Sequence, residues 1–162
     1  MSLHKLFSKR REWESAIGRL VLASAFIERT VYSSLMNYRP DLGEAALIRM
    51  THGRRLKLLE GVAAGRDDET KDAAKALVAR LRSFSIQRNR VVHNPLSYAF
   101  DRNSTDLHKF GAIIDRANPT LRLGLAELEE MAAHGEALNR RLSALLIVLF
   151  ELSDEDCEVP PT

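Results

Sequence analysis

The chain has 162 residues, of which 45% are hydrophobic and 28% are charged, a composition typical of globular proteins that excludes an intrinsically disordered chain. Its 24 lysines and arginines against 22 acids give a formal net charge of +2, which excludes recognition of a partner through overall charge. The single cysteine, Cys157, excludes an intramolecular disulfide and a zinc site built from cysteines, and a reducing cytoplasmic location is expected.

The longest apolar run, Leu145 to Phe150, is far shorter than the roughly 20 residues that a membrane span needs, so no membrane association is expected. No secretory signal is recognised near the start of the sequence. The length suits one helical domain over residues 1–152, followed by an acidic, disordered tail over residues 153–162.

Apolar residues recur every three or four positions over four long segments, which predicts four amphipathic helices. The first covers about residues 12–38 and ends before Pro40, and the second runs to about residue 62 with Asp41 as its N-cap. The third opens at Asp67 or Asp68 and closes near His93, and the last covers about residues 125–152. Short connections between long helices predict an all-α, up-and-down bundle.

The segment from residue 94 to residue 124 is less regular, and two interpretations stay open for it. Ser104 would cap a short helix. Alternatively, Phe110–Ile114 and Thr120–Leu123 would pair as a small β-hairpin around the turn residues between them.

The third predicted helix carries the most informative pattern. From Arg80 to His93 it holds four arginines and no acid. Its apolar row, which includes Leu81 and Phe84, continues into Arg88. An ionised guanidinium is not buried without a partner, so Arg88 is expected to face a polar crevice, a partner or an anion.

Asn89 and His93 are one helical turn apart and therefore share one side of this helix. The Asn89 amide would orient the imidazole, and the position of His93 at the helix end would let its ring approach Arg88. This arrangement predicts a cation and a titratable base at one phosphate.

The segment Arg88-Asn89-Arg90-Val91-Val92-His93 resembles the R-x4-6-H signature of HEPN domains, in the form where Asn follows the arginine. The context is similar too, because the signature lies late in a long helix and precedes an irregular segment and a long terminal helix. The resemblance covers roughly residues 12–152. Members of the minimal toxin type often carry a tyrosine two residues after the histidine, and this chain departs from that type with Pro95.

The resemblance implies a homodimer in which two signatures meet, and a metal-independent ribonuclease without a cofactor, acting on RNA. Arg88 and His93 would then be catalytic, Asn89 would orient His93, and Arg90 or Arg82 would bind the RNA backbone. The family also implies a toxin or antiviral defence system, with a cognate antitoxin or a regulator such as a nucleotidyltransferase.

Two other interpretations of the same residues stay open. In one, the protein is a HEPN-like module that binds RNA or a nucleotide without cutting it. In the other, it is a structural helical dimer or adaptor, in which Arg88 pairs with a carboxylate such as Glu28 or Glu44.

Overall fold

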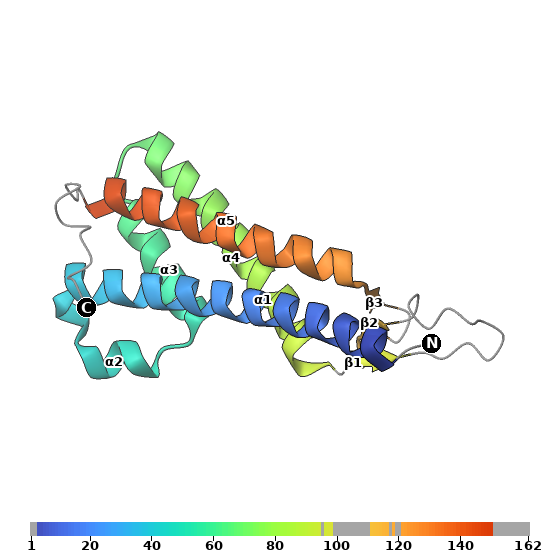
Figure 1. Cartoon of the computed structure of the whole chain (residues 1–162). Coiled ribbons are helices and arrows are strands. Elements are labelled where there is room, and N and C mark those ends of the chain that lie inside the picture. Colours follow the sequence, from blue (N-terminus) through green and yellow to red (C-terminus); the bar gives the residue numbers. More distant parts are fainter. Residues whose placement is uncertain (1–2, 95, 99–110, 117, 119–120, 151–162) are drawn as a thin grey trace, which may run out of the picture. The chain divides into compact units, whose positions relative to one another are not determined.

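The computed structural model describes residues 3–94, 96–98, 111–116, 118 and 121–150. The chain is mostly helical, as the periodicity predicts, and it carries a small sheet before its last helix (Figure 1). The elements in order are α1 (Leu3–Tyr38), a 3₁₀ turn η1 (Pro40–Leu42), α2 (Glu44–Arg49), α3 (His52–Ala63), α4 (Asp68–His93), β1 (Leu96–Tyr98), β2 (Gly111–Ile114), β3 (Arg122–Leu123) and α5 (Leu125–Phe150). In the described part of the chain, no helix combines the length and the apolar character that crossing a membrane requires.

The chain divides into two compact units, and α1, α4 and α5 each contribute to both. The first unit contains Met1–Ser24 and Phe84–Glu136, and the second contains Ala25–Ser83 and Ala137–Thr162. The predicted motif of Arg88, Asn89 and His93 therefore belongs to the first unit.

The first unit is built around an apolar core to which its three helical segments and β2 contribute. The large side chains of this core include Trp13 and Leu20 of α1, Phe84 of α4, Ile113 of β2 and Leu128 of α5, each exposed by 4% or less. Removing these surfaces from water provides the driving force that holds the last turns of α4 in place.

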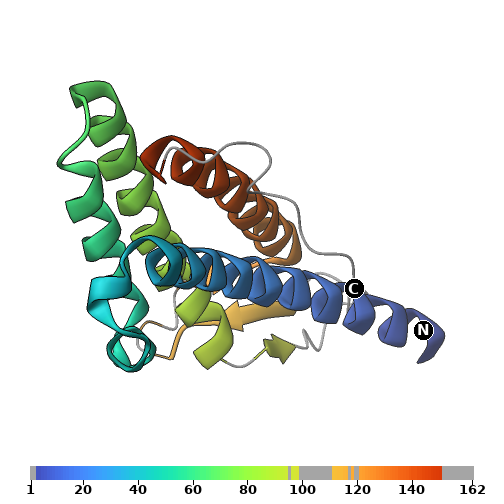
Figure 2. The ribbon, with the colours of Figure 1, turned by 90° about the vertical axis from the view of Figure 1, so that its left-hand side faces the viewer.

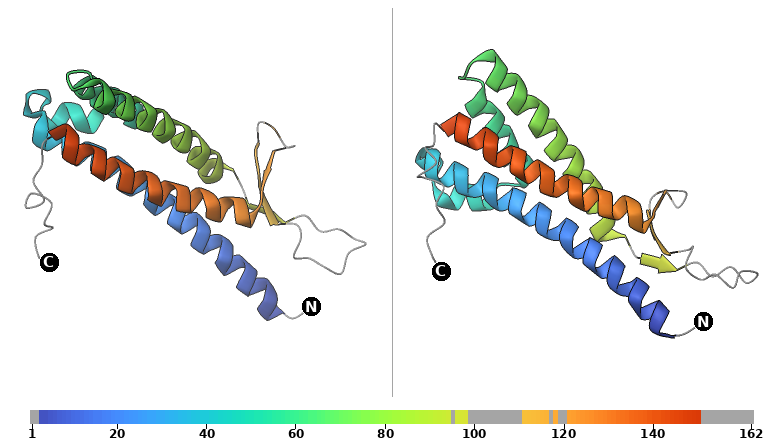
Figure 3. Two further views of the ribbon diagram at one scale, coloured as in Figure 1. Left: turned by 90° about the horizontal axis from the view of Figure 1, so that it is seen from above. Right: turned by 45° about the horizontal axis from the view of Figure 1, so that its top comes forward.

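The sheet of the first unit has three antiparallel strands in the order β1, β2, β3. The predicted hairpin is confirmed, because Ile113 and Ile114 of β2 pair with Leu123 and Arg122 of β3. Strand β1 was not predicted; it adds to the other edge of β2. Figure 3 shows β3 leading directly into α5. The alternative helix capped by Ser104 falls outside the described residues.

The second unit contains the C-terminal part of α1, the N-terminal part of α4, the helices between them and the C-terminal part of α5, with α3 beside the first turns of α4 (Figure 2). Its fully buried leucines come from five different helices. They are Leu35 of α1, Leu47 of α2, Leu56 and Leu59 of α3, Leu81 of α4, and Leu138, Leu142 and Leu149 of α5. The apolar rows predicted on the first, third and last long helices are therefore largely buried. In the second predicted helix the row is displaced, because Ile48 is 58% exposed and Leu47 is buried instead.

The prediction of one continuous second helix is wrong. Met50 and Thr51 have extended backbones, and they separate α2 from α3. The Thr51 hydroxyl accepts a hydrogen bond from the backbone N–H of Arg54, which is the contact of an N-cap and starts a new helix. The Arg55 guanidinium donates to the carbonyl oxygens of Leu47 (3.0 Å) and Ile48 (3.3 Å) in the last turn of α2, where helical carbonyl groups need partners from outside the helix.

The sequence predicted Asp41 as the N-cap of the second helix, and this prediction is wrong. Asp41 lies in the 3₁₀ turn and forms an ion pair with Arg39 at 2.7 Å, while Gly43, with φ of 69°, occupies the capping position. The φ angle is one that glycine adopts without a steric penalty.

The predicted start of α4 is confirmed. The Asp67 carboxylate accepts hydrogen bonds from the backbone N–H of Thr70 (2.8 Å) and from its hydroxyl (3.0 Å). These hydrogen bonds lower the pKa of Asp67, because they favour the charged carboxylate. The negative charge also suits the helix N-terminus, where the backbone dipoles are oriented favourably.

Gly135 lies where α5 approaches α4 and α1 within the first unit. A Cβ atom at this position would lie 2.7 Å from Cε2 of the Phe84 ring and 3.1 Å from the Cβ of Ala23. Because Phe84 is itself buried, its ring has no space into which to move. Glycine is therefore required here for close packing.

We expect Gly135→Ala to lower the free energy of unfolding by about 1 to 2 kcal/mol, since the overpacking outweighs the higher helix propensity of alanine. Gly18→Ala is the matched control, because a Cβ at Gly18 of α1 meets nothing within 4 Å. That control should raise stability by roughly 0.5 to 1 kcal/mol. Urea unfolding followed by circular dichroism measures both, and a Gly135→Ala variant as stable as Gly18→Ala would contradict the packing argument.

Candidate functional site at the end of α4

Arg88 is half-buried and faces α1 within the first unit. Its Nε donates a hydrogen bond to Oγ of Ser24 at 3.0 Å. Ser24 is only 5% exposed and lies in the apolar row of α1. The small side chain of Ser24 leaves space for the guanidinium and supplies a hydrogen-bond acceptor. Arg88, which continues the apolar row of α4, is therefore accommodated by a polar residue in the apolar row of α1.

Asn89 and His93 lie on the exposed side of α4, one turn apart. Among the residues that the structure describes, the side chains of Asn89 and His93 form no hydrogen bond or ion pair, either with each other or with another residue. Both are thus open to solvent and to a ligand. The orienting role of Asn89 stays a prediction.

Arg88 and His93 point to different sides of α4. Successive helical residues are rotated by about 100°, so two positions separated by five residues point about 140° apart. Arg88 accordingly faces Ser24, while the imidazole of His93 is exposed at the last residue of the helix. That the two groups of one chain reach the same phosphate stays a prediction.

Arg90 faces the sheet and forms an ion pair with Asp115, which follows β2 (Nε to Oδ2, 2.8 Å). The Arg90 side chain is 46% exposed and that of Asp115 is 17% exposed. Because exposed ion pairs contribute about 0 to 1 kcal/mol, a phosphate that arrives at Arg90 can compete with this carboxylate.

Asn94, directly after α4, connects the helix end to the hairpin. Its amide nitrogen donates to the carbonyl oxygen of Arg90, and its Oδ1 accepts a hydrogen bond from the backbone N–H of Arg116 at 2.8 Å. Asp115 also accepts a hydrogen bond from the backbone N–H of Asn118, which closes the turn between β2 and β3. The hairpin is therefore attached to α4 beside His93.

Sequence reasoning missed the roles of Asp115 and Asn94. The signal was present, because a basic segment without any acid needs carboxylates from another part of the chain. Which residues supply these carboxylates depends on the tertiary structure. The turn residues of the predicted hairpin did not reveal that Asp115 would pair with Arg90.

Arg82, the other predicted RNA-binding residue, lies in the second unit. It forms an ion pair with Glu60 of α3 at 2.9 Å, with side-chain exposures of 43% and 29%. Arg82 and Arg90 thus each form an ion pair with a carboxylate of their own unit. RNA binding by either residue stays a prediction.

In the described part of the chain, no three His, Cys, Asp or Glu side chains gather as a metal site would require. Comparison with known protein families, with curated proteins and with solved structures found no match for this chain.

We expect Ser24→Ala to lower the free energy of unfolding by about 1 to 2 kcal/mol, because it removes an acceptor from a half-buried guanidinium. Ser33→Ala provides the matched control, since Ser33 is an exposed residue of the same helix. Urea unfolding of both variants measures the difference. Equal stability of Ser24→Ala and Ser33→Ala would show that the hydrogen bond to Arg88 contributes nothing.

Proposed function

We propose that this protein is a metal-independent endoribonuclease of the HEPN type that cuts RNA at a composite site in a homodimer. The observation that carries the proposal is the placement of the exposed His93 and the exposed Asn89 one turn apart at the end of a basic helix, whose Arg88 is held against α1. The up-and-down arrangement of its long helices is part of the same proposal.

The chemistry needs a base, an acid and a positive charge. One His93 takes the proton of the ribose 2′-hydroxyl, whose oxygen attacks the adjacent phosphorus. The bond from phosphorus to the 5′-oxygen breaks, and this oxygen takes a proton from a second His93. The products are a 2′,3′-cyclic phosphate and a 5′-hydroxyl.

A second copy of the chain supplies the second histidine. Imidazole suits both roles because its ordinary pKa lies close to neutrality. The arginines, Arg88 first and Arg90 beside the site, stabilise the charge that develops on the phosphorane. Since Arg88 and His93 of one chain point to different sides of α4, the base of one copy would work with the arginine of the other.

The surface around His93 supports association through this side of α4. Ile86 is 64% exposed and precedes Asn89 and His93 at steps of three and four, so it shares their side of the helix. Val92, next to His93, is 45% exposed. Large exposed apolar side chains beside a candidate site are a common feature of protein interfaces.

A structural role for the motif is the second candidate. It is favoured by the hydrogen bond from Arg88 to Ser24, which places the guanidinium within the packing of the first unit. In that case the protein would be a helical dimer or adaptor. A third candidate is a module that binds RNA without cutting it.

We expect His93→Ala to lower the rate of RNA cleavage by at least about 10²-fold, since this is the scale of a lost general acid or base. The assay uses labelled RNA in EDTA, with detection of cyclic-phosphate ends, and the same RNA with 2′-O-methyl groups should stay uncut. Circular dichroism should be unchanged, because the side chain is exposed.

His134→Ala serves as the matched control for that experiment. His134 is an exposed histidine on α5 in the same unit, and its removal should leave cleavage intact. Wild-type cleavage by His93→Ala would overturn the catalytic role. Binding of RNA without any cleavage by the unaltered protein would favour the binding module, and neither binding nor cleavage would favour the adaptor.

We expect Ile86→Asp to weaken the homodimer at least tenfold, because it places a charge in the proposed interface. Ile48→Asp is the control, since Ile48 of α2 is exposed to a similar degree, 58% against 64%. Sedimentation equilibrium gives the dissociation constants. If both variants dimerise equally well, this side of α4 is not the interface, and a monomeric wild-type protein would contradict the composite site.

A further inference from the structure

A cavity of about 190 Å³ lies within the first unit, between the last turns of α4, the β2–β3 hairpin and the start of α5. This volume is smaller than the roughly 300 to 1,000 Å³ of pockets that hold drug-sized ligands, and it suits a single planar ring system. The function proposed above uses Arg90 at the edge of this cavity and gives no role to the other residues that line it.

The walls of the cavity combine apolar surfaces with hydrogen-bonding groups. Ile113, Leu123 and Met131 supply apolar contacts from β2, β3 and α5. Gln87 offers an amide donor and an amide acceptor, and Asp115 offers carboxylate oxygens. A nucleobase matches this mixture, because its faces are apolar and its edge carries both donors and acceptors.

Two arginines border the same cavity. Arg122 of β3 is exposed, and among the described residues no carboxylate pairs with it. Arg90 pairs with Asp115 across the cavity wall. Guanidinium groups recognise phosphate oxygens with paired hydrogen bonds, so a phosphate joined to a base in the cavity would meet a cation at the rim.

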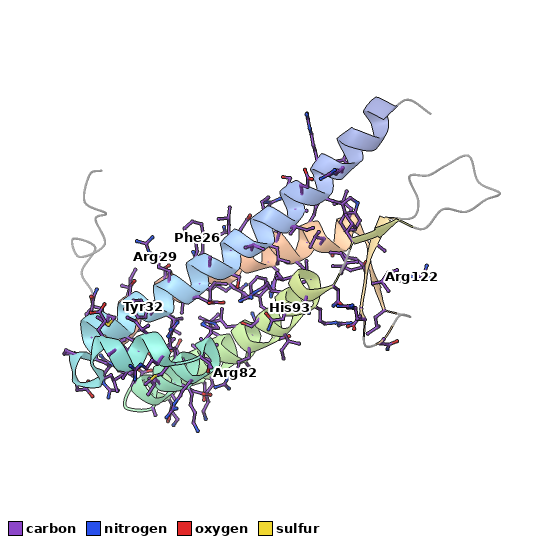
Figure 4. The ribbon with its side chains drawn as sticks, turned by 90° about the horizontal axis from the view of Figure 1, so that it is seen from below. Phe26, Arg29, Tyr32, Arg82, His93 and Arg122 are labelled. Carbon is purple, nitrogen blue, oxygen red and sulfur yellow. The ribbon has the colours of Figure 1, made fainter. Side chains whose placement is uncertain are left out.

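The cavity lies beside the predicted catalytic histidine. Arg90 and His93 are three residues apart on α4 and are neighbours on its surface. Arg90 therefore lines the cavity and is also a neighbour of His93 on the surface of α4. Figure 4 labels His93 at the end of α4 and Arg122 on the sheet.

We propose that this cavity binds the base of one RNA nucleotide and presents the adjoining phosphate to His93. The proposal rests on the function proposed above for its biological meaning, although binding of the nucleotide is measured separately. It assigns base selection to Gln87 and Asp115, and phosphate binding to Arg122 and Arg90.

Methionine methyl groups provide a direct test by NMR, because Met131 lines the cavity while Met36 and Met50 belong to the second unit. The four nucleoside 3′-monophosphates are titrated separately into the ¹³C-methyl-labelled full chain. The Met131 signal should shift with saturation while those of Met36 and Met50 stay in place. One base should bind at least about fivefold more tightly than the weakest, as expected of hydrogen bonds to a base edge.

Arg122→Ala should weaken binding of the preferred nucleotide at least fivefold. Arg116→Ala is the matched control, because it removes the same charge from an exposed residue of the same hairpin that does not line the cavity. Equal loss in both variants would overturn the assignment of Arg122. An equal response of Met131 to inorganic phosphate alone would reduce the cavity to an anion site and overturn base binding.

Failure of this proposal is distinguishable from failure of the proposed function. If Met131 does not respond to any nucleotide while RNA is cut in a way that depends on His93, the cavity proposal is wrong and the nuclease stands. If the nucleotides bind in the cavity and no RNA is cut, the cavity proposal is supported and the nuclease is wrong.

Discussion

The half-buried guanidinium of Arg88 is the constraint on which the arrangement of the site depends. Its hydrogen bond to Ser24 and the burial of Phe84 and Val91 together orient the last turns of α4, because a rigid helix that directs one residue to α1 directs all the others as well. Asn89 and His93 then face solvent, and Arg90 faces the hairpin, where Asp115 meets it. The last turns of α4 thus have three different surfaces: a packed one, an exposed one and one that borders a cavity.

This geometry separates the cation of the motif from its base within one chain. Arg88 lies against α1 and His93 lies at the exposed helix end, so a reaction that needs both at one phosphate is more readily built from two copies than from one. In the proposed homodimer, a two-fold axis would supply two His93 side chains, one as the general base and one as the general acid. The exposed apolar side chain of Ile86 on the same side of α4 is consistent with such an axis.

The small sheet supports the site and is not merely a connection. Asn94 and Asp115 join the hairpin to the end of α4 through hydrogen bonds and an ion pair, so that His93 is followed by an anchored segment. The same contacts bring β2 and β3 near Gln87 and Arg90, and these residues together line the cavity. A chain in which a free loop followed α4 would have neither the wall of apolar strand residues nor Arg122 at the rim of the cavity.

The sequence by itself determined the helical class, the apolar rows of the long helices, the Asp67 cap and the hairpin, because each depends on local periodicity or on a few neighbouring residues. It also predicted that Arg88 needs a polar partner. Only the tertiary structure decided that this partner includes Ser24, that Asp115 pairs with Arg90, and that the second predicted helix is two helices. The first two outcomes depend on contacts between residues far apart in the chain, where side-chain size and the direction of each helix face select one partner from many. The break between α2 and α3 depends on nearer contacts, the Thr51 cap and the hydrogen bonds of Arg55, whose geometry the apolar periodicity does not reveal.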